Sequence, residues 1–268
     1  MSDQARASKA VQATSPELEE AVKHTVARLK GGGRLIYAGA GASGRLALLD
    51  AAELPPTFSW PVERAVTMFA GGSKAAVTAA EEAEDDMAQG ASDARNLGVG
   101  PLDVLIGVSA SGTTRYVIGA LQAARQAGAY TITMINNRRG AFEALPHCVV
   151  VLDTGAEVIT GSTRLKAGTA QKITLSIFST AVMVGLGKAF GNLMVDVKPN
   201  NHKLRERSVW LIMAATGADE HTARTTLELA QGQLKAAIVM LRLQVSASAA
   251  RQRLTAMNGQ LRDALAHA

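Results

Sequence analysis

Short apolar segments alternate with stretches of helical spacing through the first half of the chain. Each segment is followed by glycine or polar residues, and they lie at 34–38, 63–72, 103–112, 130–137 and 148–155. Strands that alternate with helices of about 10 to 15 residues form βαβ units, which build parallel sheets with right-handed crossovers. The composition agrees, since 47% of the residues are hydrophobic but only 4% are aromatic. We predict an α/β fold with about five parallel strands flanked by helices.

Helical spacing dominates on both sides of this sheet region. Ser15 caps a predicted helix that ends at a run of three glycines over 31–33. From Arg164 onward the strand signals fade, and Gly217 and Gly232 help to divide the last part into three or four short helices. We therefore predict three parts: an N-terminal helix over 1–30, a sheet domain over 31–200 and a helical subdomain over 201–268.

Two helices inside the sheet region have predicted limits. The first begins near Ser43 and ends at or before Pro55, because the residue before a proline disfavours the helical conformation. The second is a single helix within 73–90. The longest apolar run, over 173–187, has 15 residues. Since about 20 are needed to span a bilayer, it predicts a buried helix.

Charge and cysteine content limit the class of protein. The 28 basic and 23 acidic residues give a net charge of +5 with no Lys/Arg block, which argues against nucleic-acid binding but suits a small anionic ligand. Cys148 is the single cysteine and cannot form an internal disulfide. The five histidines show no metal-binding spacing, so we expect no metal. With no apolar core of a secretion signal near the N-terminus, these features predict a cytoplasmic protein with no membrane association.

A glycine-rich loop follows the first predicted strand. It reads GAGASG over 39–44, the spacing of a dinucleotide fingerprint. A dinucleotide site also needs an Asp or Glu at the end of the second strand, about 20 residues on, but that strand is followed by AGGSK. A P-loop is excluded because no Gly-Lys-Ser/Thr follows the glycines. The loop therefore favours a smaller ligand.

A second loop of this kind, VSASGTTR over 108–115, follows the third predicted strand and precedes a helix. The carboxyl ends of parallel strands share one edge, where helix N-termini bind phosphate through free N–H groups and hydroxyls add hydrogen bonds. We predict a phosphate-ester site formed by Ser43, Gly44, Ser109, Ser111, Gly112, Thr113 and Thr114. The alternative is that glycine permits tight turns and the hydroxyls cap helices.

Three longer motifs add a resemblance to a known family. GGGRLIYAGAGASGRLALLDAAELPPTF at 31–58, TGSTRLKAGTAQK at 160–172 and GNLMVDV at 191–197 together resemble N-acetylmuramic acid 6-phosphate etherases, members of the SIS (sugar isomerase) phosphosugar-binding group. The resemblance covers about residues 31–207. It implies a five-stranded parallel sheet flanked by helices, a homodimer with sites at its interface, and a C-terminal helical module like a ubiquitin-associated domain.

The resemblance also implies a carbon–oxygen lyase reaction. The family cleaves the D-lactyl ether at C3 of its phosphosugar and leaves N-acetylglucosamine 6-phosphate, in the recycling of cell-wall amino sugars, without metal or nucleotide cofactor. Such an elimination needs a base for the C2 proton and an acid for the departing oxygen. By resemblance these groups are Glu84 and Glu53, respectively. The alternative readings are a solvated acidic run over 81–86 for Glu84 and a surface carboxylate for Glu53.

Geometry limits how Glu53 can act. It lies ten residues beyond Ser43, about 15 Å along a helix, which is too far within one monosaccharide phosphate. Either the phosphate sits on the 109–114 loop, or Glu53 serves the site of the neighbouring subunit, which we favour. In the 160–172 motif, Ser162, Thr163, Arg164 and Lys166 could orient the N-acetyl or carboxylate part of the substrate, with Lys166 as the cation for the lactyl group. The alternative is a capped, basic first helical turn.

Several positions depart from the family pattern. Ala42 replaces a threonine, Thr113 replaces an arginine, Arg115 appears two places later, and the family's opening segment has no counterpart before Ser15. These departures keep two alternatives open: a non-catalytic phosphosugar-binding regulator, similar to the glucokinase regulatory protein, and a phosphosugar isomerase. The pair of glutamates favours the etherase, since a pure sensor does not need them.

Overall fold

The computed structural model describes the whole chain except residues 1, 79, 139–145, 198–201 and 267–268. The chain divides into two compact units. One, called here the sheet unit, contains Met1–Glu53 and Pro61–Val182; the other, the helical unit, contains Leu54–Trp60 and Met183–Ala268. The three-part division at residues 31 and 201 stays a prediction.

The sheet unit contains the predicted parallel sheet, which confirms the fold class. Its strands lie in the order β2-β1-β3-β4-β5, and every neighbouring pair is parallel. Every residue of the three central strands β1, β3 and β4 is buried, as expected for apolar runs covered on both faces. The strand bounds are Leu35–Gly39 (β1), Ala65–Phe69 (β2), Val104–Ser109 (β3), Tyr130–Ile135 (β4) and Cys148–Val151 (β5).

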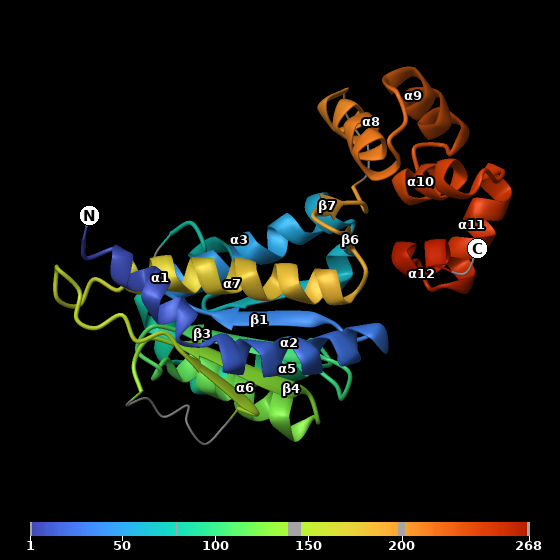
Figure 1. The fold of residues 1–268 in the computed structure, drawn as a ribbon. Helices are drawn as coiled ribbons and strands as arrows, with labels where there is room; N and C mark the ends of the chain where they lie inside the picture. The colour runs from blue at the N-terminus through green and yellow to red at the C-terminus, as the bar shows by residue number, and fades with distance from the viewer. Residues whose placement is uncertain (1, 79, 139–145, 198–201, 267–268) are drawn as a thin grey trace. The chain divides into compact units, whose positions relative to one another are not determined.

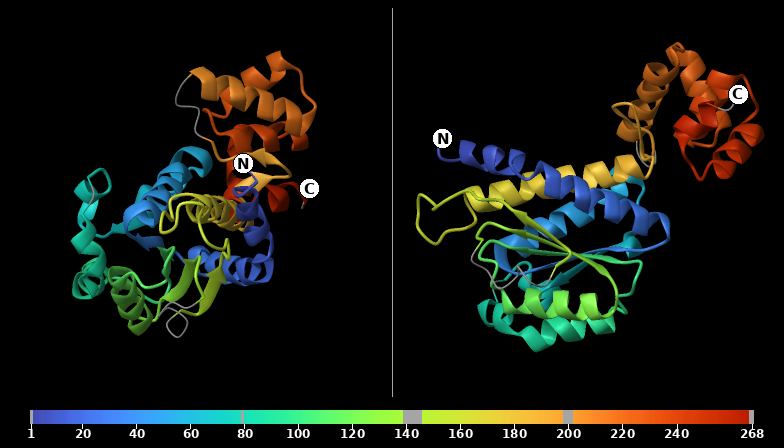
Figure 2. Two further views of the ribbon diagram at one scale, coloured as in Figure 1. Left: turned by 90° about the vertical axis from the view of Figure 1, so that its left-hand side faces the viewer. Right: turned by 60° about the horizontal axis from the view of Figure 1, so that its bottom comes forward.

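Helices cover both faces of this sheet. In Figure 1 and Figure 2, α2, α3 and α7 lie over one face, and α5 and α6 lie over the other. The α-helices are Ala5–Gln12 (α1), Ser15–Lys30 (α2), Gly41–Phe58 (α3), Gly72–Ala75 (α4), Met87–Asn96 (α5), Arg115–Gln126 (α6) and Lys166–Gly185 (α7), with short 3₁₀ turns at Val62–Arg64 (η1) and Glu81–Asp85 (η2).

Two glycines allow α5 and α6 to pack closely. A Cβ added at Gly90 would lie 1.9 Å from the carbonyl oxygen of Tyr116, and one added at Gly119 would lie 2.0 Å from that of Met87. No side chain fits at either position. Beneath the two helices, a core that includes Leu105, Val117 and Leu121 closes this face of the sheet.

Two predicted helix limits are wrong. α3 does not stop before Pro55 but continues through Pro55 and Pro56 to Phe58. Proline locks φ near a helical value, so the cost is confined to lost hydrogen bonds and crowding in the last turn, where Leu54 is buried. The helix predicted within 73–90 is broken into α4, η2 and α5. The break has a local cause, because the carboxylate of Asp86 accepts a hydrogen bond from the N–H of Gln89 at 2.8 Å and starts a new helix.

The helical unit has its own core. Val209, Ile212, Leu227, Ile238 and Leu261 are among its buried members. Five helices lie in the described part after residue 201, against the three or four expected, and a two-stranded antiparallel pair precedes them. The bounds are Ala189–Phe190 (β6), Leu193–Met194 (β7), His202–Thr216 (α8), Glu220–Leu229 (α9), Leu234–Leu243 (α10), Ala247–Ala256 (α11) and Leu261–Ala266 (α12).

The apolar run over 173–187 forms most of α7, as predicted. Leu175, Phe178 and Val182 on this helix are fully buried. Within the described residues, no helix combines the length and the apolar character that crossing a membrane requires.

Candidate functional site

The connections that follow β1 and β3 lead to opposite sides of the sheet, and the two strands are neighbours. β1 lies between β2 and β3, so its connection leaves to one side while the later strands build on the other. Gly39 pairs with Val108 in register, so the glycine-rich connection from β1 through Ala40 into α3 and the loop over 110–114 leave neighbouring strand ends. Ligands of open α/β sheets bind in the crevice at such a switch point. We call these two loops, with the first turns of α3 and α6, the crevice.

The glycines of the first loop are explained by close packing. A Cβ added at Gly39 would lie 2.7 Å from the Cα of Gly44, and one added at Gly44 would lie 2.8 Å from the carbonyl carbon of Gly39 and 2.7 Å from Cε2 of Phe69. Gly41 has a φ of 52°, in the left-handed region. The turn that starts α3 thus requires glycine, while ligand contact by Gly44 and by the buried Ser43 stays a prediction.

Glu84 reaches this loop from η2. A Cβ added at Gly41 would lie 2.8 Å from its Oε1 atom, so the carboxylate would have to shift if residue 41 carried a side chain. Glu84 is half-buried, whereas Glu82, Asp85 and Asp86 around it are exposed. The interpretation of the acidic run as a solvated face therefore does not apply to Glu84, whose carboxylate lies beside the crevice.

The second loop is organised by its own hydroxyls. Ser109, which is 2% exposed, accepts a hydrogen bond from the N–H of Gly112 at 3.1 Å and shares one with Thr114 Oγ1 at 2.8 Å. Ser111 accepts hydrogen bonds from both the N–H and the hydroxyl of Thr113, at 3.2 and 2.9 Å. Ser111 and Thr113 are exposed. Ser109 shapes the loop, and the exposed pair faces solvent, where a ligand can reach it.

A pocket of about 430 Å³ extends the crevice along the carboxyl ends of β3, β4 and β5. It brings together Ser111 and Thr163, two predicted site residues from distant parts of the sequence. Sequence reasoning missed its other polar lining residues, which include Asn136, Asp153 and Glu157. The signal was present, since Asn136 follows β4 and Asp153 follows β5 at the edge where ligands bind.

Lys166, predicted as a cation for the lactyl group, is buried and already hydrogen-bonded in the structure. It is fully buried, and its ammonium donates hydrogen bonds to Asp3 Oδ1 at 2.7 Å and to the carbonyl of Ala156. Glu157 accepts the N–H of Lys166 at 3.3 Å and that of Ala167 at 2.9 Å, and so caps α7. The ammonium of Lys166 therefore already has two acceptors inside the protein, a carboxylate and a carbonyl. Of the neighbouring predicted residues, Ser162 is half-buried and Thr163 and Arg164 are exposed.

Glu53 lies apart from the crevice of its own chain. It is exposed on α3, which is helical throughout the ten residues from Ser43, so the separation of about 15 Å along the axis applies. One turn earlier, Asp50 is buried. Burial raises the pKa of Asp50 to about 6, although hydrogen bonds from Tyr37 and Ser179 oppose this shift.

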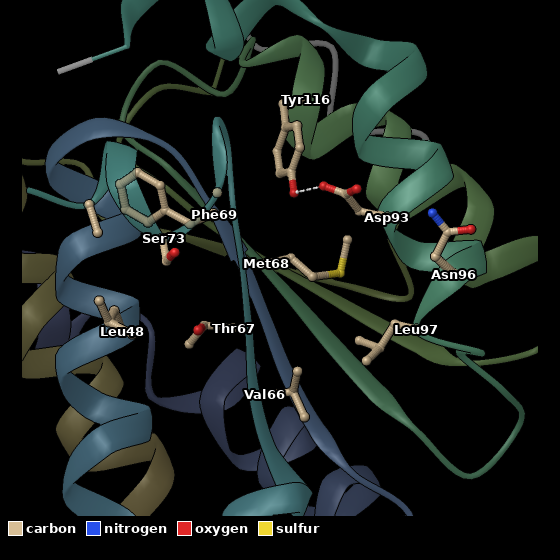
Figure 3. A pocket seen from close by; sticks show the side chains of 12 residues that line it. Leu48, Val66, Thr67, Met68, Phe69, Ser73, Asp93, Asn96, Leu97 and Tyr116 are labelled. Carbon is tan, nitrogen blue, oxygen red and sulfur yellow. Dashed lines mark hydrogen bonds between the residues drawn. The ribbon is translucent and has the colours of Figure 1, made fainter. Parts of the chain in front are cut away.

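A second pocket, of about 480 Å³, lies beside the edge strand β2. As Figure 3 shows, it is bounded by Leu48 of α3, by Met68 and Phe69, and by Tyr116, whose hydroxyl donates to Asp93 at 2.6 Å. Burial raises the pKa of Tyr116. None of the predicted site residues lines this pocket, and we place the candidate site at the crevice. Over the described residues, no group of three or more His, Cys, Asp or Glu could hold a metal ion.

Comparisons with known proteins agree with this geometry. Residues 17–125 match the glucokinase regulatory protein N-terminal SIS domain. Two phosphoheptose isomerases of known structure align at 18% identity over 68% of this chain: one from Francisella tularensis, with a TM-score of 0.55 and 93% of its chain covered, and one from Neisseria gonorrhoeae, with 0.53 and 94%. At this identity the likeness shows the fold alone.

Relatives of higher identity align over almost the whole chain. An N-acetylmuramic acid 6-phosphate etherase from Deinococcus radiodurans is 53% identical over 263 residues, which cover 98% of this chain and 86% of the relative. One of the same name from Cutibacterium acnes is 49% identical, with 96% and 84% covered. The chain therefore belongs to the N-acetylmuramic acid 6-phosphate etherase family.

Proposed function

We propose that this protein cleaves the C3 lactyl ether of N-acetylmuramic acid 6-phosphate, releasing D-lactate and leaving N-acetylglucosamine 6-phosphate. The observation that carries the proposal is the 53% identity to an etherase across 98% of the chain. The position of Glu84 beside the glycine loop supports it, because a carboxylate there lies next to the loops that could hold a sugar phosphate. The reaction makes the protein a carbon–oxygen lyase of amino-sugar recycling.

The crevice supplies the phosphate site of this proposal. The first turns of α3 and α6 offer backbone N–H groups that have no partner within their helices, and a helix N-terminus attracts anions. Ser43, Ser111, Thr113 and Thr114 add hydroxyls at the same edge. Hydroxyls and N–H groups can hold a phosphate without a fixed cation, which fits the replacement of the family's arginine by Thr113.

The proposed reaction is an elimination followed by addition of water. Glu84 takes the C2 proton of the ring-opened aldehyde, the C3–O bond breaks, and Glu53 gives its proton to the departing lactate oxygen. Glu53, now a carboxylate, then takes a proton from water as its oxygen adds to C3, and Glu84 returns the proton to C2. Both carboxyl groups end in their starting states, so no cofactor is consumed.

A homodimer with shared sites completes the proposal. Glu53 is too far along α3 to meet a phosphate held by Ser43 of its own chain. Leu49 on α3 and Ile177 on α7 are 45% and 48% exposed, and contact with a second copy would remove such apolar surface from water. In this arrangement Glu53 of one subunit serves the crevice of the other.

We also propose a cytoplasmic location. The lone Cys148 needs no oxidising compartment, which agrees with a cellular interior that keeps thiols reduced.

The test is release of D-lactate from N-acetylmuramic acid 6-phosphate, measured by an enzyme-coupled assay on the parent protein. Glu84→Gln and Glu53→Gln should each lower kcat by about 100-fold or more, because each removes a group that transfers a proton. Glu82→Gln is the matched control, since Glu82 is an exposed member of the same acidic run. No lactate, together with a higher melting temperature in the presence of the phosphosugar, would instead identify a regulatory protein.

A further inference from the structure

We propose that the pocket of about 430 Å³ along the carboxyl ends of β3, β4 and β5 receives the acetamido group of the sugar phosphate, and that Asn136 accepts the N–H of this group. The proposed function supplies the substrate, which carries an acetamido group at C2 and a lactyl ether at C3, and the proposal rests on it. Asn136 thereby becomes a residue that determines which sugar phosphate binds.

The side chain of Asn136 is held in one orientation just after β4. Its Nδ2 donates to the carbonyl oxygens of Leu152 at 3.0 Å and of Ala167 at 3.4 Å. Its Oδ1 accepts a hydrogen bond at 2.9 Å from Nε2 of Gln171, which lies on α7 and is 1% exposed. The flipped amide would place Oδ1 against two carbonyl oxygens, so the hydrogen-bond partners fix the orientation.

This network leaves Asn136 able to accept one more hydrogen bond. Over the described residues, both hydrogens of Nδ2 are used, whereas Oδ1 uses one of the two lone pairs that a carbonyl oxygen has. Asn136 is half-buried and lines the pocket, so a ligand there can contact its side chain. Asn136 therefore offers a ligand an acceptor and no donor. This suits an amide N–H and does not suit a carboxylate, which can only accept.

Other lining residues complement the rest of an acetamido group. Thr160 and Thr163 supply hydroxyls that can donate to its carbonyl oxygen. Three small apolar side chains can contact its methyl group, those of Ala110, Ala156 and Ala167. An acceptor, donors and small apolar groups thus line one pocket, and Ser111 of the proposed phosphate loop lines it as well.

Charge disfavours the lactyl carboxylate as the occupant of this pocket. Asp153 and Glu157 line it, and no Lys or Arg is among its lining residues in the part of the chain that the structure describes. Two cations lie close by. The ammonium of Lys166 already donates to two acceptors inside the protein, and Arg6 is exposed, with Nη1 at 3.6 Å from a Cβ added at Gly155. A neutral acetamido group avoids the repulsion that a carboxylate would meet beside two others.

Two sugar phosphates that differ at C2 test the proposal. N-acetylglucosamine 6-phosphate carries the acetamido group, whereas 2-deoxyglucose 6-phosphate carries no polar group at C2. Isothermal titration calorimetry would give both dissociation constants for the parent and for Asn136→Ala. The parent should bind the acetamido sugar at least about tenfold more tightly. Asn136→Ala should weaken binding of that sugar by about fivefold and leave binding of 2-deoxyglucose 6-phosphate unchanged, because only the acetamido N–H loses its acceptor.

If Asn136→Ala does not fold, Ala156→Leu tests the same pocket without breaking the network. Ala156 is exposed and lines the pocket, so a larger side chain there takes space from the acetamido group. It should also lower the preference for the acetamido sugar by about fivefold. The matched control is Ser179→Ala, which removes a buried hydrogen bond from the same helix as Gln171 but lies outside the pocket. It should lower the melting temperature and leave both dissociation constants unchanged.

Equal loss of affinity for both sugars in Asn136→Ala would overturn the proposal, because it would leave Asn136 a purely structural role. Unchanged affinities, or a parent that does not distinguish the two sugars, would overturn it as well. Binding of neither sugar would contradict the phosphate site together with this pocket. Lactate release is measured separately. A preference that depends on Asn136, without lactate from N-acetylmuramic acid 6-phosphate, would contradict the proposed reaction and support the acetamido pocket.

Discussion

The two glutamates proposed for catalysis lie in contrasting surroundings. Glu84 is half-buried, and its carboxylate lies beside Gly41 of its own chain, at the edge where we propose that the phosphate binds. Glu53 is exposed on α3, with the buried Asp50 one turn before it. The contrast supports the proposal that one chain would build the binding half of the site, while the exposed Glu53 would serve a second chain.

Mixing inactive subunits tests this contrast most strongly. Glu53→Gln and Glu84→Gln should each be nearly inactive alone, but together they should recover about a quarter of the parental activity, because half of randomly mixed dimers carry one intact shared site. The measurement is lactate release after the subunits are unfolded and refolded as a mixture. If the mixture stays as inactive as its components, both glutamates act within one chain and the contrast is wrong.

The free energy of unfolding, measured as a function of pH, tests the burial of Asp50, which lies one turn before Glu53 on α3. The pKa of Asp50 is raised in the folded protein, so the stability that the protonated form contributes is present at about pH 4 and is lost as pH rises through about 6. Asp50→Asn should therefore be more stable than the parent at pH 8, by about 2 to 3 kcal/mol, and equal to it near pH 4. Urea unfolding at several pH values would measure this.

Asp103 provides a control of opposite sign. Burial raises the pKa of Asp103, but hydrogen bonds from Arg34 and from the backbone N–H groups of Gly100 and Arg34 outweigh this effect and lower it. Its contribution is present above the unfolded pKa and is lost as pH falls. Asp103→Asn should thus be less stable than the parent at pH 8, and a gain there would contradict the assignment of both carboxylates.

The smallest expected effect concerns the crevice itself. Gly44→Ala places a methyl group 2.8 Å from the backbone of Gly39, so it should destabilise the protein by about 2 kcal/mol and weaken phosphosugar binding. Gly100→Ala is the control, because a Cβ there meets nothing within 4 Å. Urea unfolding and a ligand-dependent melting temperature are the measurements. Equal behaviour of the two variants would show that close packing at the loop is not required.

Features encoded by neighbouring residues could be predicted from the sequence, whereas features that depend on distant contacts could not. The five strands and the two loops at their carboxyl ends were predicted correctly, because apolar runs, glycines and hydroxyls are local signals. The helix limits at Pro55 and within 73–90 were wrong, because proline's φ is compatible with the last turn of α3 and the cap at Asp86 divides the acidic segment. The role of Glu84 could be suspected only by resemblance, since its place beside Gly41 depends on how η2 folds back.

The sequence by itself thus determined a parallel α/β sheet with a small-ligand edge, since periodicity and turn residues act over a few positions. Only the tertiary structure decided which side chains meet. Asp50 contacts Ser179, which lies 129 positions away, and Lys166 pairs with Asp3 across 163 positions. Such contacts depend on the packing of α3, α7 and the N-terminal segment, and no local pattern of residues encodes them.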